Sequence, residues 1–127
     1  VAVQVDAGLP LLALDRTRMR LLLRNLLSNA RRHSVDAPKP PRIDIVRAAQ
    51  GGVRLSVRDH GGGVDEAALP HLAEPFYRPD ADRSRGSGGV GLGLYLCKLV
   101  AQAHAGRFLV ENAHPGLCVT VVLPAPS

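Results

Sequence analysis

Aromatic side chains are scarce in this 127-residue sequence, and tryptophan is absent. Aromatic residues make up 3% of the chain, which is too few for the exposed stacking platforms that single-stranded nucleic acids bind. Cysteine is also rare: Cys97 and Cys118 lie within apolar segments and lack the spacing of metal ligands. The sequence therefore disfavours a single-strand-binding module and indicates small buried thiols in a reducing compartment.

Long apolar runs are missing as well. No uninterrupted run approaches the roughly 20 residues that cross a bilayer. The chain begins without the basic start and apolar block of a signal peptide, and without methionine, so we expect a fragment of a longer protein. Apolar residues make up 46% and charged residues 21%, which predicts one folded domain over 1–127.

Acidic residues are outnumbered, with 11 Asp and Glu against 16 Lys and Arg, for a net charge of +5. A basic balance fits an anionic partner such as nucleic acid, phosphate or an acidic protein surface. Only Lys39 and Lys98 among these cations are lysines. This preference for arginine fits a GC-rich genome equally well.

Apolar periodicity and turn residues predict the order of the elements. The strongest helix runs from about Asp15, its N-cap, to about Ser34. The other expected elements are an edge strand at 1–5, a hairpin at 43–57, a short helix at 65–73, a helix at 92–104 that Gly106 ends, and strands at 108–110 and 117–123. Adjacent hairpins with segregated helices favour an α/β two-layer sandwich, with a mixed, mostly antiparallel sheet and helices on one face.

Two stripes lie side by side on the helix at 15–34. At about 100° per residue, one stripe is apolar and is predicted to be the core face: Met19, Leu23, Leu26, Leu27 and Ala30. The second stripe is polar and is flanked by Leu22: Asn25, Asn29, Arg32 and His33. Asparagines four apart meet on a helix surface, and their amide oxygens suit a hard cation. A solvated polar face is an equally good interpretation of this helix alone.

Asp59 continues the alternation of the buried valines and leucine before it, so its carboxylate is predicted to face the core. A fixed acceptor in an apolar pocket selects an amino group, for example that of adenine. The glycines at 61–63 would let the backbone approach a flat ligand closely. Taken alone, Asp59 fits better as a turn residue that caps these glycines.

Glycines recur at 86–93, directly before the predicted helix, inside a stretch without periodicity that begins at Glu74. A glycine-rich helix start presents free N–H groups to phosphate. The Walker A and Rossmann patterns do not match, and a flexible loop without ligand is the alternative. Together with the asparagine pair and Asp59, this segment would complete three parts of one ligand: a cation site, an amino-group acceptor and a phosphate cradle.

Four motifs resemble the ATP-binding domain of sensor histidine kinases, in the superfamily with gyrase, heat-shock chaperone and mismatch-repair ATPases. They are NLLSNARRH at 25–33 (N box), DHGGG at 59–63 (G1 box), EPFYR at 74–78 (F box) and GVGLGL at 89–94 (G2 box). The stretch from Gly116 to Leu123 fits the family's terminal strand. The resemblance covers nearly the whole chain and implies a Bergerat-type α/β sandwich with a long mobile ATP lid at about 74–90.

The resemblance also implies a role for each motif residue. Asn29 would bind Mg²⁺, with Asn25 supporting it or reaching the phosphates. Arg32 would contact phosphate, and the His33 ring would lie against the nucleotide. Asp59 would accept from the adenine amino group in a pocket shaped by Gly61 and Gly63. Phe76 and Arg78 would lie at the edge of the lid. Gly89, Gly91 and Gly93 would let the lid close and present N–H groups to the phosphates, and Leu92 is a further cofactor-binding residue. The catalytic set would be Asn25, Arg32 and Arg78.

The implied activity is binding of Mg-ATP and transfer of the γ-phosphoryl group to a histidine on a separate dimerisation domain, for relay to a response regulator. Related ATPases carry a water-activating glutamate where this chain has Asn25, so we expect slow hydrolysis. The resemblance further implies a monomeric fragment on the cytoplasmic side of a parent anchored in the bacterial inner membrane, with no nucleic-acid partner.

Several residues depart from the family pattern. Val90 and Leu117 replace common threonines, so ATP affinity is expected to be modest. The family's acceptor histidine is missing, and His71, His104 and His114 are expected at the surface, so self-phosphorylation is not expected. Three alternatives stay open: a serine kinase of the anti-sigma-factor type, a nucleotide-binding module without catalysis, and a basic nucleic-acid binder.

Overall fold

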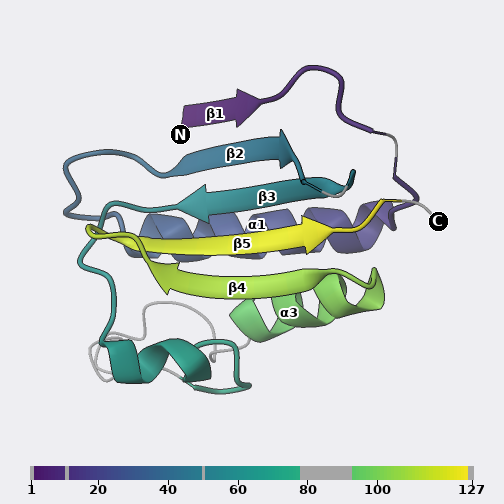
Figure 1. Cartoon of the computed structure of the whole chain (residues 1–127). Helices are drawn as coiled ribbons and strands as arrows, with labels where there is room; N and C mark the ends of the chain where they lie inside the picture. The colour runs from purple at the N-terminus through teal and green to yellow at the C-terminus, as the bar shows by residue number, and fades with distance from the viewer. Residues whose placement is uncertain (1, 11, 50, 78–92, 126–127) are drawn as a thin grey trace.

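The computed structural model describes residues 2–10, 12–49, 51–77 and 93–125 (Figure 1). A five-stranded sheet has the order β1-β2-β3-β5-β4. Two α-helices lie on one face of this sheet, as Figure 1 shows. The elements are β1 (Ala2–Val5), α1 (Arg16–Arg32), β2 (Arg42–Arg47), β3 (Val53–Arg58), the 3-10 helix η1 (Glu66–His71), α3 (Gly93–Ala103), β4 (Arg107–Asn112) and β5 (Leu117–Leu123).

The strand pairing confirms the expected mixed, mostly antiparallel sheet. β1 pairs with β2 in parallel at the edge of the sheet, and β2–β3, β3–β5 and β5–β4 are antiparallel. The last strand of the chain, β5, lies between β3 and β4, and β4 is at the edge of the sheet. The start of β5 therefore lies next to the end of β3, where Arg58 is opposite Cys118.

Asp15 caps α1 as predicted. Its backbone is extended and its carboxylate accepts a hydrogen bond from the backbone N–H of Arg18 at 3.0 Å. The side chain satisfies one of the free N–H groups at the helix start. At the other end, Arg31 and Arg32 lie in the last turn, where positive charge complements the helix dipole.

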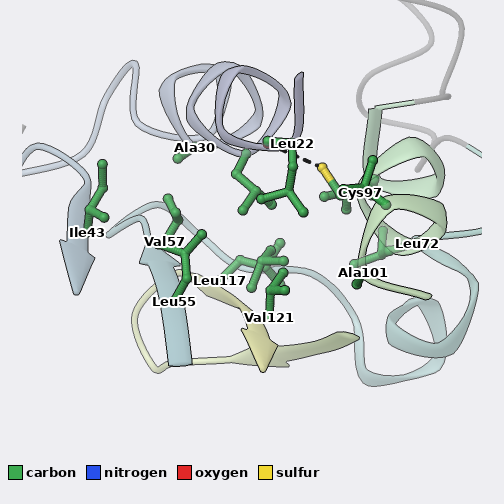
Figure 2. Packing of buried hydrophobic residues seen from close by; sticks show 14 of the residues in the cluster. Leu22, Ala30, Ile43, Leu55, Val57, Leu72, Cys97, Ala101, Leu117 and Val121 are labelled. Atoms are coloured by element: carbon green, nitrogen blue, oxygen red, sulfur yellow. Dashed lines mark hydrogen bonds between the residues drawn. The ribbon is translucent and has the colours of Figure 1, made fainter. Parts of the chain in front are cut away.

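The predicted core face of α1 is correct at Leu26 and Ala30, but the buried face is rotated by part of a turn from the expected one. The buried side chains of this helix are Leu22, Leu26, Asn29 and Ala30, whereas Met19, Leu23 and Leu27 are only partly buried. The reason is α3, which packs beside α1 and turns the Leu22 side inward. Figure 2 shows Cys97 of α3 directed at Leu22, whose carbonyl accepts from the thiol at 3.5 Å.

The short helix predicted at 65–73 is a 3-10 helix, and Asp65 makes no capping hydrogen bond. Pro70 lies inside it, and in an α-helix a proline ring clashes with the carbonyl four residues earlier, so the short 3-10 turn is favoured. Gly106 does follow α3, but the residue in the left-handed conformation is Ala105, with φ 57°. Gly106 is required for a different reason: a Cβ there would lie 2.5 Å from the carbonyl oxygen of Val122.

His104 is not the surface residue that the sequence predicts. His71 and His114 are exposed, but His104 is half-buried. Its Nε2 accepts from the backbone N–H of Asp15 at 3.0 Å, and its Nδ1 lies 2.8 Å from the Val100 carbonyl. One imidazole therefore joins the end of α3 to the start of α1.

Within the described ranges, neither α-helix combines the length and apolarity needed to cross a membrane.

Candidate functional site

Two asparagines lie on one edge of α1, beside its buried stripe. Asn29 is 7% exposed, and its Oδ1 accepts from the Arg32 guanidinium at 3.2 Å. Asn25 donates from Nδ2 to the Leu21 carbonyl at 2.9 Å. This bond directs the Asn25 oxygen away from the helix backbone, toward Gly93, where a Cβ would lie 3.3 Å from it. The N box therefore meets the first residue of α3.

Asp59 is 2% exposed, at the end of β3. Its Oδ1 accepts from the backbone N–H groups of Gly61 at 3.0 Å and Leu117 at 3.2 Å. The side chain is therefore buried, as its strand alternation predicts, and it also caps the glycine turn. No hydrogen bond among the described residues ends on Oδ2. One oxygen is held by the backbone, and the second keeps its capacity to accept a hydrogen bond.

Glycines bring the backbone close to Asp59. A Cβ on Gly61 would lie 2.0 Å from the His33 carbonyl oxygen and 3.3 Å from Asp59 Oδ1. A Cβ on Gly116 would lie 1.9 Å from the Asp59 carbonyl oxygen, and Gly116 has φ +92°. Only glycine fits either position without displacement of backbone. Gly61 thus joins the end of α1 to the G1 box, and Gly116 joins β5 to it.

Gly63 has φ +71° and acts more indirectly. Its Cβ would lie 2.6 Å from Oδ1 of Asn112. That amide accepts from the N–H of Val64 at 3.0 Å and donates to the Val64 carbonyl at 2.7 Å. Gly63 therefore lets the chain leave the site along the end of β4. The sequence patterns did not single out Asn112 or the role of Gly116. The available signals were the asparagine at the end of one strand and the Pro-Gly turn before the next strand.

A hollow of about 330 Å³ lies where the end of α1 meets the loop after β3. Its lining includes Arg32, His33, His60, Gly61 and Gly62, together with Asp36. The N box and the G1 box thus share a concave surface, on which Arg32 supplies one positive charge and Asp36 one negative charge beside two imidazole rings. Among its described lining residues, the Arg32 guanidinium is the group that suits an anionic ligand.

The remaining candidates lie apart or outside the described residues. Phe76 is 68% exposed and has φ 66°. Most of the expected lid lies outside the described residues, including Arg78, Gly89, Gly91 and Leu92.

In the ranges that the structure describes, no three His, Cys, Asp or Glu side chains form a group that could hold a metal ion. The amide oxygens of Asn25 and Asn29 are the hard donors at this edge of α1, and they fit a cation that keeps other oxygen ligands.

Known proteins resemble this chain in sequence and in fold. The chain matches the family described as "Histidine kinase-, DNA gyrase B-, and HSP90-like ATPase" over residues 14–127. The signal transduction histidine-protein kinase AfsQ2 of Streptomyces coelicolor is 40% identical over 125 residues, which are 97% of this chain and 22% of that protein.

Two solved structures share the fold of this chain. Full-length ShkA in complex with AMPPNP has a TM-score of 0.80 at 26% identity, covering 99% of this chain and 26% of that one. The mycobacterial sensor histidine kinase MprB has a TM-score of 0.75 at 28% identity, over 97% of this chain and 81% of that one.

The chain spans 13% to 26% of the length of the curated relatives it matches. Its match to the family profile nonetheless covers almost all of its own residues, and its sheet and helices have the fold of histidine kinase catalytic domains. The chain therefore belongs to the histidine kinase-, DNA gyrase B- and HSP90-like ATPase family, and its relatives are sensor histidine kinases.

Proposed function

We propose that this chain is the domain, over 1–127, that binds Mg-ATP in a sensor kinase and donates the γ-phosphoryl group to a histidine on a separate dimerisation domain. The observation that carries the proposal is Asp59, a buried carboxylate with one oxygen held by backbone N–H groups. Family membership and the similarity to an AMPPNP-bound kinase support it.

The adenine end is assigned to the G1 box. Asp59 Oδ2 accepts from the adenine amino group, and the bonds to Gly61 and Leu117 keep the carboxylate in place when the ligand is absent. Gly61 shapes this pocket by letting the loop after β3 pack directly against the His33 carbonyl at the end of α1. The His33 ring, on the same hollow, lies against the nucleotide. Gly63 fixes the course of the loop that walls this pocket.

The phosphate end is assigned to α1 and the lid. Asn29 and Asn25 are the ligands of Mg²⁺, which when bound neutralises charge on the triphosphate. Arg32 contacts phosphate, and its bond to Asn29 Oδ1 holds both groups at one edge of the helix. Phe76, Arg78, Gly89, Gly91, Leu92 and Gly93 are proposed to close over the phosphates.

The chemistry is transfer rather than hydrolysis. A histidine ring nitrogen forms a bond to the γ-phosphorus, the bond from that phosphorus to the bridging oxygen breaks, and ADP leaves. Such transfer needs mainly positioning and charge neutralisation. Asn25 has no proton-accepting group with which to activate water, so the isolated chain hydrolyses ATP slowly.

The phosphohistidine then supplies a response regulator. The parent kinase would be anchored in the bacterial inner membrane with this domain on its cytoplasmic side, and nucleic acid is not among its partners. The isolated chain is proposed to be a monomer.

The full-length parent kinase tests the transfer step with γ-labelled ATP. We expect acid-labile label on a histidine, lost in Asn29→Asp and retained in the control Asp44→Asn, whose carboxylate pairs with Arg42 on β2. Acid-stable label on serine would instead identify the anti-sigma-factor type of kinase. Bound ATP with no transferred label would identify a non-catalytic module.

A further inference from the structure

A second concave surface lies along α1. It encloses about 470 Å³ and is lined by four apolar and three basic side chains: Leu14, Met19, Leu23, Leu27, Arg16, Arg20 and Arg24. We call it the α1 groove. Among the described residues that line it, none is acidic, and none belongs to the candidate nucleotide site.

The apolar wall of the α1 groove is not part of the closed core. Met19, Leu23 and Leu27 recur every four residues, so they form one line along the helix, and each is only partly buried. Leu14, just before the helix, is 41% exposed. The line that is fully buried is that of Leu22 and Leu26. A continuous apolar strip left open beside the core is typical of a surface that another molecule covers.

The basic wall is a row of exposed arginines at the same four-residue spacing. Arg16, Arg20 and Arg24 make no ion pair or hydrogen bond through their side chains within the described residues. Arg18, by contrast, lies 3.8 Å from the Asp15 carboxylate. Like charges four residues apart destabilise a helix. Such a row, without partners among the described residues, is complementary to a row of acidic side chains.

The two flanks of α1 are separate. At about 100° per residue, Leu23 and Asn25 are on opposite sides of the helix, with the buried Leu22–Leu26 line between them on the core side. A molecule in the α1 groove would therefore leave Asn25, Asn29 and the hollow beside Gly61 uncovered.

We propose that the α1 groove binds an amphipathic helix of a partner protein that carries an acidic edge. Its apolar stripe packs against Met19, Leu23 and Leu27, as in other helix-in-groove complexes. Aspartates or glutamates at four-residue spacing then face Arg16, Arg20 and Arg24. The hollow shape favours an inserted helix over a flat anionic bilayer, for which an apolar ridge is the better fit.

The test uses two synthetic helical peptides of about five turns, identical except that glutamates along one edge are replaced by lysines. We expect the 127-residue chain to bind the glutamate peptide and not the lysine peptide, less tightly as salt is raised. Backbone shifts in NMR spectra should be confined to Leu14 and the exposed flank of α1.

Charge variants make the test specific. Arg20→Glu should weaken binding roughly threefold and Arg16→Glu/Arg20→Glu/Arg24→Glu more than roughly tenfold, and the triple variant should gain the lysine peptide. Arg54→Glu, the same change on an exposed residue of β3, should bind as the unchanged chain does. Thermal unfolding checks that each variant is folded.

Four results would overturn the proposal: no binding of the glutamate peptide, equal binding of both peptides, shifts mapping elsewhere, or equal losses in Arg20→Glu and Arg54→Glu. Binding to phosphatidylserine vesicles without peptide binding would replace it with a membrane surface. Dimerisation that is lost in Arg20→Glu would replace it with a second copy of this chain.

Discussion

Asp59 shows how much of this site depends on single residues. A carboxylate is buried at a position where its strand alternation favours an apolar side chain, and a buried charge is unfavourable unless it is hydrogen-bonded. Two backbone N–H groups supply that compensation. They are available because Gly61 and Gly116 let two turns approach within the reach of one carboxylate.

Gly116→Ala is expected to destabilise the fold strongly. A Cβ there would lie 1.9 Å from the Asp59 carbonyl oxygen, and φ is +92°, so both sterics and backbone conformation oppose alanine. We expect a loss of about 2–4 kcal/mol of unfolding free energy in urea titrations. Gly62→Ala is the matched control, because a Cβ there meets nothing within 4 Å; equal losses in the two variants would refute the steric account.

Thiol reactivity should follow burial. Burial raises the pKa of Cys97 to about 12 and raises the pKa of Cys118 as well. Because the thiolate is the reactive form, neither thiol should react appreciably with a disulfide reagent at pH 7 in the folded chain, Cys97 least of all. Both should react quickly in urea. Rapid labelling of Cys97 in the native protein would contradict its burial.

The raised thiol pKa also predicts the sign of a pH effect on stability. The folded state holds the Cys97 proton more tightly than the unfolded state, so this contribution is complete below about pH 9, the ordinary value, and declines as pH rises toward 12. Urea titrations from pH 8 to 10.5 should therefore show a steeper decline for the unchanged chain than for Cys97→Ala. Equal slopes would refute the assignment.

At the scale of elements, features that depend on residues close in the sequence were predicted more accurately than features that depend on tertiary packing. The N-cap at Asp15, both hairpins and the edge strand follow from side chains close in sequence, and all are present. The predicted inward face of α1 was only partly correct: Leu26 and Ala30 are buried as expected, but α3, whose Cys97 lies 75 residues after Leu22, decides that Leu22 is covered as well. The same distinction applies to the candidate site. The spacing of Asn25, Asn29 and Asp59 singled them out as candidates, whereas the positions of Gly116 and Asn112 depend on the order of the strands.

His104 tests the packing of the two helices directly. His104→Ala removes the acceptor for the Asp15 N–H and the bond to the Val100 carbonyl. We expect about 1–2 kcal/mol lower unfolding free energy, measured by thermal or urea unfolding. Gln102→Ala, an exposed change on the same helix, should be nearly neutral; a neutral His104→Ala would mean that the histidine does not join α1 to α3.

At the scale of the whole molecule, α1 serves three surfaces. One side packs on the sheet and α3, one edge presents Asn25 and Asn29, and the opposite flank forms the α1 groove. Because these surfaces are distinct, we expect the proposed nucleotide site and the proposed partner site to be occupied independently. The sheet order is what makes this possible, since it brings the end of β3 and the start of β5 under one end of the helix.

Separate surfaces predict separate effects on nucleotide binding. Arg20→Glu should change the Kd for Mg-ATP by less than about twofold at physiological salt, because exposed charges beyond a Debye length are screened. Arg32→Glu, next to Asn29, should weaken it at least about tenfold. Isothermal titration of both variants makes the comparison, and similar losses would show that the two flanks of α1 are not independent.

The most direct test of the account is calorimetric titration of Mg-ATP into the Asp59→Asn variant. The asparagine oxygen can still accept from Gly61 and Leu117, so the fold should survive while the amide N–H groups face the adenine amino group, donor against donor. We predict at least about tenfold weaker binding, with Asp44→Asn binding as the unchanged chain does. Unchanged affinity in a folded Asp59→Asn variant would contradict the nucleotide site.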